Sequence, residues 1–310
     1  MHELEPSFAS FPSPALHRRE LIAFLSALAA APVRAASSLG ALSSLPRTAK
    51  MPVLFVGHGS PMNVIQDNPW RPQWEGVGKL FGREFPKPAL ILCISAHWIT
   101  DGWFVTGAGK PKTIHDFGGF PQALFDQQYP APGAPALARA LADRGGARKL
   151  RLDTTEWGYD HGAWSVLKPM FPAADIPVLQ LSMDYSRPPA EHLALASELK
   201  FLRERGVLVV GSGNVVHNLR ASRRGAAPDQ AYEWAHEFDS WARPLIEAAD
   251  GKSLAAFLGK GDLARLAHPS HDHMLPLIHA VAVASPGERA RQFGEGFQSG
   301  AISMRSVLWG

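Results

Sequence analysis

Three histidines follow short apolar runs of the chain, at points where buried strands are expected to end. They are His58 in "FVGHGSP", His97 in "LCISAHW" and His217 in "VVGSGNVVHNL". Histidine is the commonest metal ligand and the side chain that titrates near neutral pH. A lone histidine of this kind is more often structural. Three at equivalent strand ends would meet, and their buried nitrogens would then need a proton or a metal ion between them.

A fourth candidate lies in "HPSHDHMLPL", which contains His268, His271 and His273. His273 directly precedes the apolar segment 274–284, so we expect its side chain to face the core. The other two are expected at the surface or just behind the ligands. Spacing alone does not choose among the three, because a loop can direct any of them inward.

Two further histidines stand in glycine- and aromatic-rich stretches that read as loops. They are His115 in "TIHDFGGFP" and His161 in "WGYDHGAW". Such surroundings suit a pocket that receives a flat apolar ligand. An all-nitrogen donor set suits Zn, Fe, Cu or Ni, whereas Mg²⁺ and Ca²⁺ prefer carboxylates.

Other chemistries lack their sequence signatures. HExxH, paired CxxC, GxSxG, Walker A and GxGxxG motifs are absent. The formal net charge of +3 comes without a long basic stripe, which argues against nucleic acid as a partner. Cys93 is the single cysteine, which excludes an intramolecular disulfide, and its apolar neighbours predict a buried side chain.

The elements that must position these histidines alternate between strand and helix patterns. Apolar runs predict buried strands at 53–56, 89–95, 178–182 and 207–211. Helical spacing covers 135–144, 190–205, 232–249 and 274–284. The alternation predicts an α/β fold, a single domain with a central sheet flanked by helices. In such sheets ligands bind at the carboxyl ends of the strands, so the metal site is expected there.

Residues 1–50 differ from the rest and predict an N-terminal extension, followed by a catalytic domain over 51–310. The stretch "HRRELIAFLSALAAAPVRAAS" has an arginine pair, an apolar core and small residues near Ala35, like a twin-arginine export signal followed by a linker. Its apolar core is too short for a stable membrane span. Periplasmic export and a frayed N-terminal helix on a cytoplasmic protein stay open as alternatives.

Seven motifs resemble, in the same order, those of DOPA 4,5-dioxygenase-type proteins. These are class III extradiol ring-cleavage dioxygenases, in the superfamily of protocatechuate 4,5-dioxygenase β subunits. The motifs are "MPVLFVGHGSPMN", "SAHW", "TIHDFGGFPQALF", "YPAPG", "GYDHGAW", "GSGNVVHNL" and "HMLPL". The resemblance covers about residues 51–310. It implies an extradiol dioxygenase that inserts O₂ into a small catechol-type aromatic diol such as DOPA.

The resemblance also implies roles for single residues. The implied metal ligands are His58, His97 and His273. His217 is implied either as an acid/base or as a fourth ligand, and we expect it to share the catalytic proton transfers with His161. His115 is implied as a substrate-binding residue. The resemblance implies Fe²⁺ as the working metal, and Zn²⁺ is expected as a bound or alternative metal because three or four imidazoles hold it readily.

Two alternatives use the same histidines. One is a zinc-binding protein of this fold without oxygenase activity, and the other is a zinc hydrolase that uses a zinc-bound hydroxide. A hydrolase would normally need a Glu or Asp base beside the metal. Asp160 and Asp272 are available for that role, although the spacing of neither argues for it.

Overall fold

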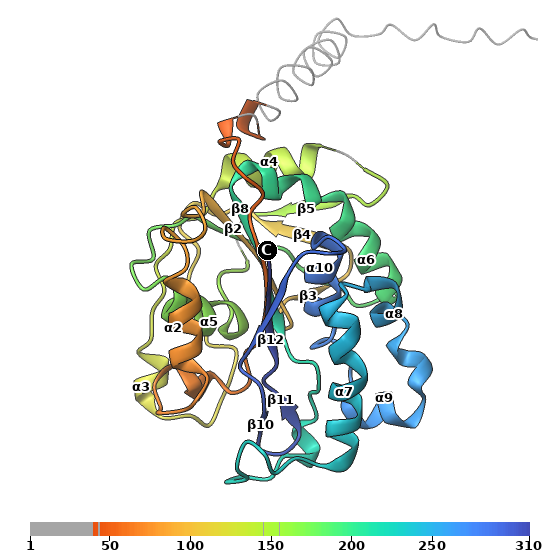
Figure 1. Cartoon of the computed structure of the whole chain (residues 1–310). Coiled ribbons are helices and arrows are strands. Elements are labelled where there is room, and N and C mark those ends of the chain that lie inside the picture. The colour runs from red at the N-terminus through yellow and green to blue at the C-terminus, as the bar shows by residue number, and fades with distance from the viewer. Residues whose placement is uncertain (1–39, 43, 145, 155) are drawn as a thin grey trace, which may run out of the picture.

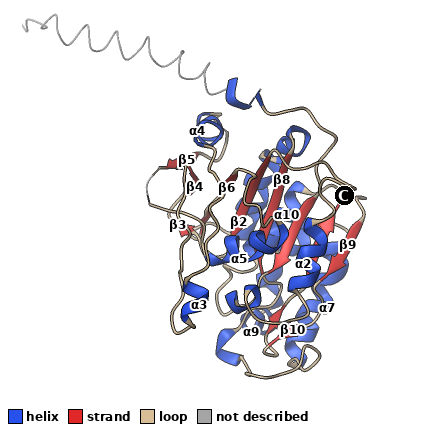
Figure 2. Cartoon of the chain, turned by 90° about the vertical axis from the view of Figure 1, so that its left-hand side faces the viewer, coloured by secondary structure: helices blue, strands red, loops and turns tan. Residues whose placement is uncertain are grey.

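Four apolar runs form the parallel centre of one sheet, in the order β6 (Val178–Gln180), β2 (Leu90–Ser95), β8 (Val207–Gly213) and β1 (Val53–Gly57). The computed structural model describes residues 40–42, 44–144, 146–154 and 156–310. Two C-terminal strands, β12 (Ser306–Trp309) and β9 (Ala290–Phe293), extend the sheet beyond β1; β12 pairs antiparallel with β1, and β9 pairs antiparallel with β12. Figure 2 shows these strands side by side, with helices on both faces.

Helices cover both faces of this sheet, which is why every residue of β1, β2 and β8 is buried. Successive residues of β1 alternate between two cores. Val53 and Phe55 belong to one hydrophobic cluster, whereas Leu54 and Val56 belong to the other. Each cluster fills the space between one face of the sheet and its own set of helices.

The two helical layers lie on opposite sides of the sheet in Figure 1. One layer consists of α2 (Arg71–Gly78) and α5 (His161–Met170). The other consists of α6 (Pro189–Glu198), α7 (Glu233–Glu247), α8 (Gly251–Ala255), α9 (Asp262–Ala267) and α10 (Leu275–Val283). α5 and α10 contact the central strands directly. Their N-terminal ends lie near the carboxyl edge of the sheet, because Gly162 abuts Ser95 at the end of β2 and the His273 carbonyl abuts Gly213 at the end of β8.

The remaining elements are short and lie around this frame. The strands are β3 (Ile99–Thr100), β4 (Trp103–Thr106), β5 (Leu150–Asp153), β7 (Met183–Asp184), β10 (Phe297–Gln298) and β11 (Ile302–Ser303). The helices are α3 (Gln122–Phe125) and α4 (Pro135–Asp143), with 3₁₀ turns η1 (Pro61–Val64), η2 (Lys200–Arg205), η3 (Leu219–Ala221) and η4 (Phe257–Lys260).

The predicted α/β class, with one central sheet flanked by helices, is confirmed. All four predicted strands belong to the sheet, and all four predicted helical segments are helical, the segment 190–205 being divided into α6 and η2. Cys93 is buried as predicted. The placement of His161 in a loop was wrong, because it is the first residue of α5, where Asp160 caps the helix by accepting from the Ala163 N–H.

The predicted export signal over residues 1–35 lies outside the described residues and stays a prediction. Across the part of the chain that the structure describes, no helix combines the length and the apolar character needed to cross a bilayer.

Candidate metal centre

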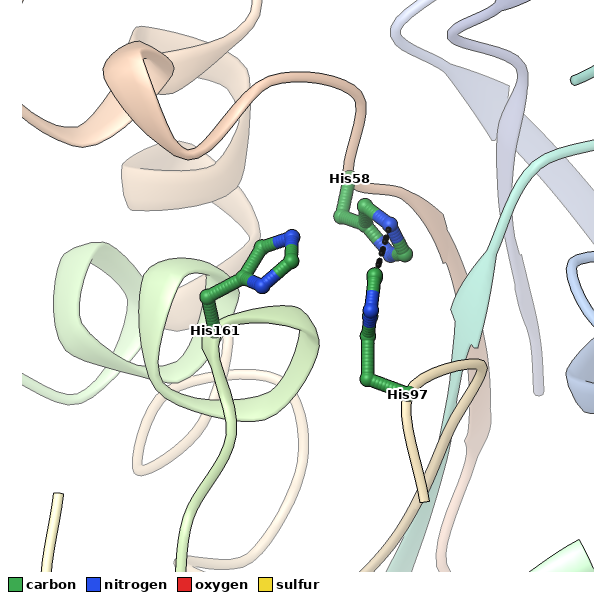
Figure 3. Close-up of side chains that lie close together, drawn as sticks. All are labelled: His58, His97 and His161. Carbon is green, nitrogen blue, oxygen red and sulfur yellow. Dashed lines mark hydrogen bonds between the residues drawn. The ribbon is translucent and has the colours of Figure 1, made fainter. Parts of the chain in front are cut away.

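Five histidines gather at the carboxyl edge of the sheet. They are His58 after β1, His97 after β2, His161 at the start of α5, His217 after β8 and His273 before α10. One nitrogen from each of His58, His97 and His161 lies within 4.8 Å of the other two, as the close-up in Figure 3 illustrates. The ring of His273 is centred 5.2 Å from that of His58 and 5.1 Å from that of His97.

His58 is held by the strand next to its own. Its backbone N–H donates to Gly213, which continues the β1–β8 pairing past the strand end. Its Nδ1 lies 3.0 Å from the Ser212 hydroxyl, and that hydroxyl donates its own proton to the Gly162 carbonyl at 2.5 Å. The Ser212 oxygen therefore accepts from His58, which places the proton on Nδ1 and leaves the Nε2 lone pair free.

The glycines around His58 serve backbone geometry. Gly59 has a φ of +56°, in the left-handed region that favours glycine, so the chain turns sharply just after the histidine. Gly213 has a different role: a Cβ there would lie 2.3 Å from the His273 carbonyl oxygen. Its missing side chain lets the segment before α10 approach β8, and Asn214 donates its N–H to that same carbonyl.

His97 and His161 share one carboxylate, that of Asp116. The Asp116 Oδ2 lies 3.3 Å from His97 Nδ1 and 3.0 Å from His161 Nδ1. The contact with His161 is short, but its angle is poor for a hydrogen bond. Burial alone would raise the pKa of Asp116, but its contacts with the ring and the backbone N–H of His161 hold the pKa below the usual value. An ionised carboxylate only accepts, so it favours the Nδ1–H form of both rings. The His97 Nε2 then faces the His58 Nε2 at 3.2 Å.

His273 follows the same pattern with its own partner. Its Nδ1 contacts the carboxylate of Asp272, the preceding residue. Its Nε2 is buried and has no hydrogen-bond partner among the described residues. A buried nitrogen lone pair without a partner is costly unless a ligand satisfies it.

His217 stacks on His273. The two rings are 3.4 Å apart and nearly parallel, with an angle of 6° between their planes. The His217 backbone is fixed by a hydrogen bond from its N–H to the Ala267 carbonyl. Burial, followed by the nearby His273, lowers the pKa of His217, so its ring is neutral at pH 7 and can accept a proton.

The donor set fits a metal ion. Burial, followed by the neighbouring imidazoles, lowers the pKa values of His58 and His97, so both rings are neutral at pH 7. Four of the five histidines, all except His217, have their Nδ1 beside an oxygen acceptor and their Nε2 available, which is the arrangement typical of metal-binding histidines. Two facing lone pairs 3.2 Å apart repel one another unless a cation accepts both.

The other predicted site residues lie further out. The His115 Nε2 donates to the Gln127 carbonyl, and its ring contacts Phe117, which in turn contacts His161. His268 is buried and donates to the Val215 carbonyl, so it is not at the surface. His271 stacks on Tyr185.

Sequence reasoning missed two members of this centre, Asp116 and Ser212. Both meet their histidines across long stretches of chain, which no local spacing reveals. The one signal in the sequence is local, since Asp116 is the acidic residue within "TIHDFGGFP" and directly follows His115.

Comparison with known proteins identifies the family. Residues 52–301 match the family model described as the catalytic LigB subunit of aromatic ring-opening dioxygenase. The chain is 42% identical over 264 residues to the 4,5-DOPA dioxygenase extradiol of Escherichia coli K12, covering 84% of this chain and 95% of that protein. It is 35% identical over 261 residues to the 4,5-DOPA dioxygenase extradiol of Beta vulgaris, covering 81% and 94%.

A solved structure agrees with the sequence comparisons. The crystal structure of an uncharacterized protein from Escherichia coli K12 superposes with a TM-score of 0.71 at 37% identity, covering 84% of this chain and all of that one. The chain therefore belongs to the LigB family of aromatic ring-opening dioxygenases, and its enzyme class is that of the extradiol dioxygenases.

Proposed function

We propose that the protein cleaves the ring of a DOPA-like catechol beside its diol, using Fe²⁺ bound at the carboxyl edge of the sheet. The observation that carries the proposal is the buried Nε2 of His273, which has no partner in the described part of the chain. The ring of His273 is centred 5.2 Å from that of His58 and 5.1 Å from that of His97. The names of the relatives support DOPA as the model substrate.

His58, His97 and His273 would hold the metal through Nε2. When bound, Fe²⁺ supplies the Lewis acidity and the electron transfer to O₂ that ring opening requires. Both oxygen atoms of O₂ enter the product, so the reaction needs no external reductant. Zn²⁺ would bind the same nitrogens and is expected as an alternative, inactive occupant.

His217 and His161 are proposed to move protons. A catechol hydroxyl must lose a proton when it binds, and a proton must be returned before the product leaves. Positioned imidazoles typically contribute ~10²–10⁴-fold to such steps. His161 stands on the His97 side of the cluster, with ring centres 3.8 Å apart, and His217 stands on the His273 side, so the two flank the proposed ligands.

Aromatic side chains beside His161 suit a flat ring. Phe117 is 5.6 Å from His161, and Phe120 is 5.3 Å from Phe117, measured between ring centres. Both phenyl rings are only partly buried, so they have surface left to contact a ligand. His115 is proposed to act here by supporting Phe117, which it contacts edge to face.

The hydrolase alternative needs a free carboxylate base, and the candidate carboxylates are engaged. Asp160 is fully buried and accepts from Ser95 at 2.5 Å and from Gln180 at 2.7 Å. Asp272 contacts the His273 Nδ1. Both therefore have structural partners, which disfavours hydrolysis.

The test begins with anaerobic protein. The chain is reconstituted with Fe²⁺, DOPA is added, and O₂ is admitted. We expect a yellow semialdehyde and one O₂ consumed for each ring opened. Bound Fe²⁺ without product from DOPA or any catechol of a broad panel would refute the proposal.

Single substitutions test the ligand set separately. His58→Ala, His97→Ala and His273→Ala should each lose most of the bound metal, measured by elemental analysis after dialysis. Retention of metal in two of the three variants would refute this ligand set without bearing on the reaction itself.

A further inference from the structure

We propose that Asp116 is a positioning residue that sets the tautomer and orientation of both His97 and His161, and so couples metal binding to proton transfer. This inference rests on the proposed function, in which His97 binds the metal and His161 moves a proton. Asp116 itself contacts neither substrate nor metal in this arrangement; it acts through the two imidazoles.

Asp116 has two oxygens with separate tasks. Oδ1 accepts the backbone N–H of His161 at 2.8 Å, which fixes the first turn of α5 to the loop that carries Asp116. Oδ2 lies 3.0 Å from His161 Nδ1 and 3.3 Å from His97 Nδ1. One carboxylate thus joins the segment after β2 to the start of α5.

The loop that carries Asp116 is anchored on both sides. The Ile114 N–H donates to the Tyr159 carbonyl at 2.7 Å, and the Trp164 indole N–H donates to the Ile114 carbonyl at 2.9 Å. The next residue, Phe117, packs against His161. Because these contacts fix the backbone around it, the carboxylate has a defined position relative to the two rings.

The shared acceptor has a chemical consequence. A carboxylate beside Nδ1 keeps the proton on that nitrogen, so His97 presents a bare Nε2 toward His58, and the Nε2 of His161 is likewise left bare. If either ring changed tautomer, its Nε2–H would point at the centre and could neither bind a metal nor accept a proton.

Asp116→Asn is the informative substitution. The amide oxygen can still accept from the His161 backbone, so the start of α5 is retained, but the amide NH₂ then faces the two Nδ1 atoms and donates where an acceptor is needed. Both rings are driven toward the Nε2–H tautomer. Loss of a partner behind a metal-binding histidine typically costs ~10–100-fold in metal affinity.

The measurement uses Co²⁺ as the probe, bound to the full chain without substrate. Affinity is obtained by competition with a chelator, and the visible d–d spectrum reports the ligand geometry. We expect Asp116→Asn to weaken Co²⁺ binding by ~10–100-fold and to change the spectrum. Asp116→Glu, which keeps a carboxylate, should recover part of the affinity.

Glu288→Gln is the matched control. The Glu288 carboxylate is 15% exposed, close to the 17% of Asp116, and pairs with Arg203 and Lys50, away from the five histidines. This variant should lower stability while leaving Co²⁺ affinity and spectrum unchanged.

The outcomes separate the inference from the proposed function. Wild-type affinity and spectrum in a folded Asp116→Asn variant would overturn the role of Asp116. Failure of the wild-type chain to bind Co²⁺ would refute the metal centre itself, and equal loss of affinity in Glu288→Gln would show that the effect of Asp116 is general destabilisation.

Discussion

The imidazole rings of His217 and His273 lie face to face, 3.4 Å apart and within 6° of parallel. An imidazole nitrogen binds a metal in the plane of its own ring. Two rings in separate parallel planes therefore do not direct their lone pairs at one point, and the unpartnered, buried Nε2 belongs to His273. This relationship favours His273 as the ligand and His217 as the acid/base.

The stacking predicts different results for substitutions in the two rings. His217→Phe keeps a ring against His273 but has no nitrogen, so it should retain bound metal and lose ~10²-fold or more in turnover. His273→Phe should lose the metal. Elemental analysis and O₂ uptake measure the two effects. Metal loss in His217→Phe equal to that in His273→Phe would make His217 a ligand.

Ser212→Ala tests how His58 is oriented. The variant removes the oxygen that accepts from His58 Nδ1, so we expect Zn²⁺ affinity to fall by ~10-fold or more, measured by chelator competition. Ser165→Ala is the matched control, because its hydroxyl is buried in α5 and has no hydrogen-bond partner among the described residues. An equal change in both variants would contradict a specific role for Ser212.

Much of this architecture could be predicted from the sequence because β1, β2 and β8 are buried on both faces. Such strands read as continuous apolar runs, and the histidines that follow them share one edge by topology. β9 was missed because all four of its residues are only partly buried and two of them are polar. α5 was missed because Gly162 and Pro169 are atypical of helices, although Asp160 is a good capping residue.

The residues that hold the histidines in place, Asp116 and Ser212, could not be predicted from the sequence. The contact of Asp116 with the His161 backbone spans 45 residues, and that of Ser212 with His58 spans 154. Neither residue repeats at a helical or strand period with its partner. Such pairs exist only once the strands and α5 have packed.

Gly162→Ala should disturb the centre through packing. A Cβ at Gly162 would lie 2.4 Å from the Ser95 hydroxyl and 2.8 Å from His97 Cδ2, so the His97 ring must move. We expect weaker metal binding even though alanine favours the helix by ~1 kcal/mol.

Gly76→Ala in α2 provides the comparison for Gly162→Ala. A Cβ at Gly76 meets nothing within 4 Å among the described residues, so this change should raise stability by ~0.5–1 kcal/mol and leave metal affinity unchanged. Thermal unfolding and chelator competition measure both quantities. Unchanged metal affinity in Gly162→Ala would contradict the predicted displacement of His97.

A second pair of histidines, away from the proposed ligands, predicts acid sensitivity. His192 and His279 are fully buried between α6 and α10, and each donates one N–H to a backbone carbonyl, Asp184 and Leu275 respectively. Burial lowers the pKa of His192 to about 4 and that of His279 to about 3, the latter also through the nearby His192.

The sign of the pH effect follows from which state binds more protons. A histidine in the unfolded chain has a pKa of about 6.5, so below that pH it binds a proton that the buried His192 and His279 of the folded chain do not bind. The free energy of unfolding therefore falls as the pH drops from about 6.5 toward 4. His279→Leu removes one of these sites and should reduce the loss of unfolding free energy between pH 7 and pH 5. Urea unfolding of metal-free protein at both pH values measures it, with His236→Gln as an exposed control. An undiminished pH dependence in His279→Leu would contradict the assignment.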